Sequence, residues 1–147
     1  MANEEHLGII TKGPKTWNKW RHANPSVTPN LAVADLQGIN LNGVNLVRAN
    51  LRGTNLSDVN LRWANLAMSD LSGADLNRAN LAGACLKNTV FFETNLINTY
   101  LVGADFDITD LTAADTSDAD FGDIQAFLGR IKRLVMYYWG HIRRLCM

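Results

Sequence analysis

The stretch NLVRANLRGTNL (Asn45–Leu56) has a leucine at every fifth residue, with an asparagine directly before each leucine. A period of five fits neither the 3.6-residue repeat of an α-helix nor the two-residue alternation of a β-strand. In a helix these leucines would spiral through every face, and in a straight strand they would point alternately to opposite faces. The stretch therefore predicts a structure that turns a corner once in every five residues.

The same frame runs from Leu31 to Phe121 without insertion or deletion, which makes nineteen consecutive units. Leucine is the central residue of every unit except those centred on Phe91, Phe106, Thr116 and Phe121. The residue two positions before the centre is small or β-branched, and the residue between them is nearly always Asn or Asp, whose side chains bond to nearby backbone groups. If each unit is a short extended piece followed by a corner, the central and the small residue both point inward. The pattern predicts an all-β solenoid filled with leucine and phenylalanine.

The units centred on Leu51, Leu66, Leu76 and Leu81 follow the consensus A-[ND]-L-x-x, which resembles the pentapeptide-repeat family. The leader EEHLGIITKGPKTWNKWRHANPSVTPNL is similar to the segment that precedes such repeats in cyanobacterial members. The resemblance implies a right-handed quadrilateral parallel β-helix with four units in each coil. Nineteen units would then form between four and five coils, roughly 20–25 Å long at ~4.8 Å for each coil.

A solenoid exposes its core and unpaired backbone groups at both ends, so we expect covers outside the repeats. We divide the chain into an N-terminal helical cap (1–28), the β-helix (29–123) and a C-terminal amphipathic α-helix (124–147).

In the N-terminal cap, Asn3 is expected to begin a first helix and Pro14 a second, which Asn24 and the proline after it would end. Trp17 and Trp20 share one helix face, and we interpret them as a cover for the first coil instead of a ligand-stacking pair.

After Phe121 the five-residue frame gives way to a 3.6-residue period, for which Asp123 is a natural N-cap. Three interpretations of this segment stay open. The helix can fold over the last coil, it can pair with the same helix of a second chain in a homodimer, or it can lie on a membrane surface, which we favour least. Its apolar stripe consists of Ile124, Phe127, Leu128, Ile131, Leu134, Val135, Tyr138, Ile142 and Leu145.

The composition favours a soluble cytoplasmic protein. Fourteen basic residues balance fourteen acidic ones, and the acidic N-terminus lacks the features of a signal peptide. Cys85 and Cys146 form no metal-binding pair, which fits a reducing compartment, and whether they pair with each other stays open.

No constellation in the sequence suggests catalysis, so we expect a non-enzyme without cofactor or metal. The three histidines, His6, His22 and His141, all lie in the terminal segments, so the serines of the repeats lack a nearby general base. No phosphate-binding glycine loop or metal-binding motif occurs.

The repeats carry twelve acidic and five basic residues between Pro29 and Asp123, a net charge of −7. Some members of the family that this chain resembles imitate B-form DNA and occupy the DNA-binding saddle of type II topoisomerases, so this is one alternative function. However, seven of the acids occupy the position that Asn otherwise fills, and the other five are matched by the five bases. We expect no direct binding of nucleic acid.

Several apolar residues occupy positions that should face outward, and they form our candidate interaction surface. They lie on different sides of the coils, so we expect a belt that either the C-terminal helix or another protein covers. Our prediction is a scaffold that acts through protein–protein contact with an unidentified partner; the alternatives are the topoisomerase-binding DNA mimic and a membrane-surface protein. The candidate residues are Trp63, Met68, Phe92, Ile97, Tyr100 and Val102.

Overall fold

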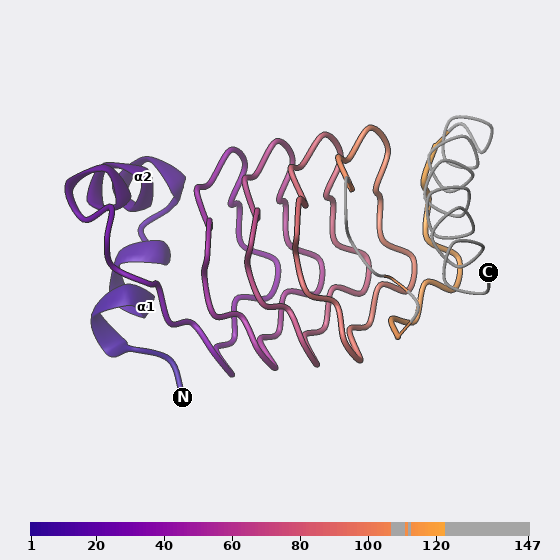
Figure 1. Cartoon of the computed structure of the whole chain (residues 1–147), viewed down its shortest axis with the longest axis horizontal. Helices are drawn as coiled ribbons and strands as arrows, with labels where there is room; N and C mark the ends of the chain where they lie inside the picture. The colour runs from indigo at the N-terminus through magenta and orange to yellow at the C-terminus, as the bar shows by residue number, and fades with distance from the viewer. Residues whose placement is uncertain (107–110, 112, 123–147) are drawn as a thin grey trace, which may run out of the picture.

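The computed structural model describes residues 1–106, 111 and 113–122. Two helices lie at one end of a stack of rectangular coils, and each coil has nearly the same outline as its neighbours (Figure 1). The amphipathic helix predicted for residues 124–147 and its predicted N-cap, Asp123, lie outside the described residues. Cys146 lies outside them too, so a pair between Cys85 and Cys146 stays an open prediction.

The two helices begin as the sequence predicts. Helix α1 (Glu4–Ile10) is capped by Asn3, whose side-chain oxygen accepts a hydrogen bond from the amide of His6 at 3.0 Å. Helix α2 (Pro14–Ala23) has its proline in the first turn, where a missing N–H group costs nothing, and ends at the C-cap residue Asn24.

Both helices are fastened to the first coil by polar contacts. The indole N–H of Trp17, a fully buried residue, donates to the carbonyl of Asn45 at 2.7 Å. The buried guanidinium of Arg21 donates to the carbonyl of Val47 in the first coil at 3.4 Å and to the carbonyl of Val27, before the coils, at 2.6 Å, and its burial lowers the pKa of this group. In α1, the Nδ1 atom of His6 accepts a hydrogen bond from the amide of Asn30 at 3.0 Å. The backbone groups at this end of the stack thus find partners in the leader.

The coil has a period of twenty residues. Parallel bridges join Asn30 to Asn50 and Asn50 to Asp70, and the same spacing continues along the stack. Each unit closes with a tight turn, as in the hydrogen bond of 3.1 Å from the amide of Ala34 to the carbonyl of Leu31. Four five-residue units therefore make one coil with four corners, as the quadrilateral prediction requires.

Parallel bridges between the coils correspond to the short extended pieces that the sequence predicts between corners. Each bridge joins one residue to the residue twenty positions away. Backbone hydrogen bonds continue on both sides of a bridge: the amide of Leu31 donates to the carbonyl of Asn50 at 2.8 Å, and the amide of Asn50 donates to the carbonyl of Pro29 at 2.8 Å.

The interior is the leucine stack that the period predicts. Leu46, Leu61, Leu76 and Leu86 are completely buried, as are the small residues Ala79 and Ala84, which lie two positions before Leu81 and Leu86. Each buried leucine contributes roughly 1.5–3 kcal/mol in transfer terms. At the last described coil the core is less covered: Phe121 is half-buried and packs against Phe106 at 6.0 Å between ring centroids.

The Asn or Asp before each centre holds the corner from outside. The side-chain oxygen of Asn50, for example, accepts a hydrogen bond from the amide of Arg52 at 3.2 Å, and this contact recurs along the chain. The third residue of each turn has a positive φ, which glycine adopts without cost, as at Gly43 (67°). The sequence prediction missed that ten non-glycine residues in the described part of the chain also have a positive φ, among them Trp63 (57°).

One buried hydroxyl interrupts the regular core. Thr54, Thr89, Thr94 and Thr99 each donate from the side chain to a leucine carbonyl of the preceding coil, but the hydroxyl of Ser69 has no partner. We expect Ser69→Ala to raise the free energy of unfolding by up to about 1 kcal/mol, because an unsatisfied buried group disappears. Thr99→Ala should lower it, because a hydrogen bond and a methyl group are lost. Urea denaturation of both variants would show this, and destabilisation by Ser69→Ala would contradict it.

Candidate interaction surface

The corners carry the side chains that the fold leaves free for function. At each corner two residues follow the centre of a unit, and most of them are exposed or half-buried; Ala32, Ser57 and Ser72 are buried. Corners twenty residues apart stack in a column. We number the four corners of a coil in chain order, starting with the corner that follows Leu31. The first corner holds residues 32–33, 52–53, 72–73 and 92–93, the second 37–38, 57–58, 77–78 and 97–98, the third 42–43, 62–63, 82–83 and 102–103, and the fourth 47–48, 67–68 and 87–88.

The third corner has the largest exposed apolar side chain of the described coils. Trp63 is 65% exposed, and its indole lies against Gly83, so that a Cβ atom at residue 83 would clash with the ring carbons Cε3 and Cζ3. Val102 lies at the same corner two coils after Trp63, and its side chain lies against Gly122 on the following coil, 3.1 Å from the position of a Cβ atom there. The glycines of this corner thus make room for the side chain of the preceding coil.

This arrangement predicts different effects of alanine at Gly83 and Gly103. Both glycines have a positive φ (69° and 71°), so alanine is strained at either site, but only at Gly83 would the new methyl group meet Trp63. We expect Gly103→Ala to destabilise by about 1 kcal/mol and Gly83→Ala by more. In a Trp63→Gly background the two substitutions should become equal, as measured by thermal denaturation in a double-mutant cycle. A difference that persists in that background would contradict the stacking of Trp63 on Gly83.

The other predicted surface residues are distributed around the coils. Met68, 51% exposed, lies on the fourth corner, one corner along the same coil from Trp63. Tyr100 is exposed beside the third corner, in the column of residues between the second and third corners. Phe92 lies on the first corner, and the half-buried Ile97 on the second. The structure therefore places Met68 one corner from Trp63 on one coil, and Ile97, Tyr100 and Val102 along two neighbouring corners of a later coil, while Phe92 lies on the first corner.

The charged residues of the coils are partly paired. Arg52 binds Asp70 at 2.9 Å, and Lys87 binds Asp105 at 3.2 Å. Arg78 binds Asp58 at 2.7 Å, and its hydrogen bond is the main reason why the pKa of this carboxyl lies below the usual value. Burial opposes ionisation of Asp70, but hydrogen bonds from Ser72 and Arg52 outweigh this effect and lower its pKa. Such exposed pairs contribute little to stability, since water screens them.

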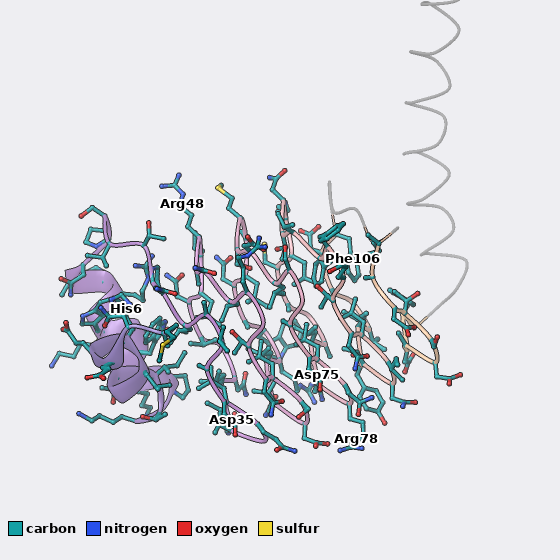
Figure 2. The ribbon with its side chains drawn as sticks, turned by 90° about the horizontal axis from the view of Figure 1, so that it is seen from below. His6, Asp35, Arg48, Asp75, Arg78 and Phe106 are labelled. Atoms are coloured by element: carbon teal, nitrogen blue, oxygen red, sulfur yellow. The ribbon has the colours of Figure 1, made fainter. Side chains whose placement is uncertain are left out.

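Positive and negative net charge lie on different sides of the solenoid. Between residues 29 and 106, the third and fourth corners and the column between them hold Arg48, Arg62, Lys87 and one acid, Asp105, for a net charge of +2. Figure 2 shows Arg48 on the edge opposite to Asp35, Asp75 and Arg78. The remaining corners and columns hold five acids and two bases, a net charge of −3: Asp35, Asp58, Asp70, Asp75, Glu93, Arg52 and Arg78.

No three His, Cys, Asp or Glu side chains in the described part of the chain lie close enough to hold a metal ion. His6 packs against Trp17 and Trp20 between the helices, where it serves as a hydrogen-bond acceptor. None of the helices in the described part has the length and apolar character needed to cross a membrane.

A filled solenoid with variable corners on a constant frame defines a class of repeat protein. The model of the family of pentapeptide repeats matches residues 30–66, 54–91 and 90–123, and the chain belongs to this family. Members of the family form right-handed quadrilateral β-helices, and the four-cornered coil of twenty residues agrees with that architecture.

Among solved structures, alr5209, a pentapeptide-repeat protein of Nostoc PCC 7120, is similar with 30% identity and a TM-score of 0.62, over 76% of this chain and 89% of that one. HetL of the same cyanobacterium, which is involved in the regulation of heterocyst differentiation, is 30% identical with a TM-score of 0.51 over 62% of this chain. Rfr23 of Cyanothece 51142 is 26% identical with a TM-score of 0.54 over 67% of this chain. The chain spans 42% of the HetL structure and 64% of the Rfr23 structure. None of the curated proteins compared with this chain matches it.

Proposed function

We propose that this protein is a non-enzymatic scaffold that acts by binding another protein through its corner side chains. One observation carries the proposal: large apolar side chains are exposed at positions where neither the core nor the turn needs a large side chain. Glycine fits the positive φ of Trp63 and Met68 better than either side chain does, and these are 65% and 51% exposed. Side chains that neither fill the core nor relieve the turn are available to a partner.

The separation of roles along each unit supports the same function. The centre and the small residue before it are buried, and the Asn or Asp between them bonds the corner, so these positions build the frame. The exposed corner residues can vary with the least disturbance of the stack. The involvement of the similar protein HetL in regulation is consistent with a role in binding instead of catalysis.

Imitation of DNA is less well supported by the described coils. Residues 29–106 carry six acids and five bases, so their net charge is −1. A duplex of the same length would present a dense array of phosphates on its surface. The excess of acid in the repeats lies between Asp107 and Asp123, mostly beyond the complete coils. This charge distribution favours a protein partner that binds a surface with both apolar side chains and charges of both signs.

Affinity capture from an extract of the source cells tests the proposal. The full chain should retain a specific protein, and at least one of the variants Trp63→Gly, Phe92→Ser and Arg78→Gly, placed on three different corners, should lose it while the others keep it. All three positions are exposed, so the variants should remain folded. Retention of nothing beyond a blank matrix, or equal retention by all variants, would contradict binding through the corners.

A further inference from the structure

We propose that the third and fourth corners, with the column between them, bind an acidic protein segment that carries an apolar anchor residue. We call this surface the basic–aromatic face; it consists of Arg48, Arg62, Trp63, Asn65, Ala67, Met68 and Lys87. The inference rests on the proposed scaffold function and specifies where the partner binds and what its surface must offer.

The anchor site is the indole of Trp63. The ring is held against Gly83 on the next coil, and the residues above it at this corner, Ala82, Gly83 and Gly103, are too small to cover it. An exposed tryptophan that is already positioned loses little conformational entropy on binding. Tryptophan and arginine are also the residues that most often dominate the energy of protein interfaces. The ring thus offers a flat apolar contact to an aliphatic or aromatic side chain.

Cationic groups flank this ring. Arg62 precedes Trp63 at the same corner, and Arg48 lies at the fourth corner directly below Met68 in its column. Both arginines are exposed, and within the described chain neither has a carboxylate in ion-pairing distance. A guanidinium binds a carboxylate through two parallel hydrogen bonds, which gives direction as well as affinity. The preferred ligand therefore combines carboxylates with one apolar side chain.

Among the coils of residues 29–106, the distribution of charge favours this face for an acidic ligand. The first and second corners, with the columns that border the first, have a net charge of −3 and would repel it. At the end of the stack, α2 extends the cationic surface: it contacts the third corner through Asn18 and Gly43, it has no acid, and its Lys15 and Lys19 are exposed.

A nucleic acid is less suitable than a protein segment for the same face. Its affinity grows with the number of phosphates that are neutralised, and the coils supply only two arginines without an ion pair here. Single-stranded DNA nevertheless belongs in the test, because bases also stack on tryptophan.

The test uses the full chain and short fluorescein-labelled peptides, with binding measured by fluorescence polarisation. One peptide combines aspartate and glutamate with a single phenylalanine, the second replaces the phenylalanine by serine, and the third replaces the acids by lysine. Oligothymidylate is the fourth probe. The variants are Trp63→Gly and Arg48→Gly, with Arg78→Gly as the matched control. All three positions have a φ between 57° and 59°, so glycine suits each of them, and the two arginine variants change the net charge equally.

We expect the acidic peptide with phenylalanine to bind most tightly. Trp63→Gly and Arg48→Gly should each weaken it about tenfold or more, and Arg78→Gly less than about twofold. The inference is overturned if this peptide fails to bind at millimolar concentration, if the lysine peptide binds equally well, if Arg78→Gly weakens binding as much as Arg48→Gly, or if oligothymidylate binds more tightly. If the peptides fail to bind but the affinity capture still retains a protein through another corner, the result excludes the basic–aromatic face as the binding site and leaves the scaffold function in place. If capture fails as well, the scaffold function is excluded with it.

Discussion

Leu66→Asp is expected to unfold the whole solenoid. Leu66 is completely buried between Leu46 and Leu86 of the neighbouring coils, and its amide donates to the carbonyl of Cys85 at 2.9 Å. A carboxylate in this stack has no partner and costs several kcal/mol, which is comparable with the total stability of about 5–15 kcal/mol for a small domain. Since each coil is bonded only to its two neighbours, loss of a central coil separates the stack into parts with exposed ends.

Circular dichroism and thermal denaturation would reveal this effect. The control is Ala67→Asp, which places the same charge one residue later, at a partly exposed position on the fourth corner. We expect the control to melt within a few degrees of the unaltered protein and Leu66→Asp to show no cooperative transition. A native spectrum and an unchanged melting temperature for Leu66→Asp would refute the filled interior.

Trp17→Ala is expected to have the second largest effect. The side chain is completely buried, and its indole N–H donates to the carbonyl of Asn45 at 2.7 Å. Truncation of a buried tryptophan typically costs about 3–5 kcal/mol, and here it also leaves a carbonyl of the first coil without its donor. The end of the leucine core, beginning with Leu31, would become accessible to water.

Hydrogen exchange distinguishes this local effect from general unfolding. In Trp17→Ala, we expect amide protection to fall in α1, α2 and the first coil, while the amides of Leu66 and Leu71 stay protected longer. Trp17→Phe keeps most of the apolar volume and removes only the N–H donor, so it should be destabilised by about 1 kcal/mol. Equal exchange in the first coil of Trp17→Ala and the unaltered protein would contradict the role of Trp17 as a cover.

The sequence predicted the coil well because one constraint is repeated many times. A period of five allows neither helix nor straight strand, and nineteen units leave few alternatives. The positions of Asn3 and Pro14 likewise predicted the beginnings of the helices, because each has a local chemical reason. The parallel bridges at a spacing of twenty residues agree with the short extended pieces that the period predicts between corners.

The interaction surface was harder to predict. The order of the units gives the corner of each side chain, so the grouping of Trp63 with Val102 follows from the period of twenty. The position of the indole over Gly83 does not follow, because it depends on the direction of a side chain across neighbouring coils. The segregation of charge also becomes visible only when ion pairs such as Arg78–Asp58 are known, since pairing decides which charges remain for a partner.

Photochemical cross-linking in the source cells tests the central claim most directly. Replacement of Trp63 by p-benzoylphenylalanine places a reactive ketone on the basic–aromatic face, and the same replacement of Arg78 places it on the second corner with a nearly equal φ (57° at both residues). The account predicts a discrete adduct with one acidic protein from position 63 and little or none from position 78. Adducts from position 78 alone, or none from either position, would contradict it.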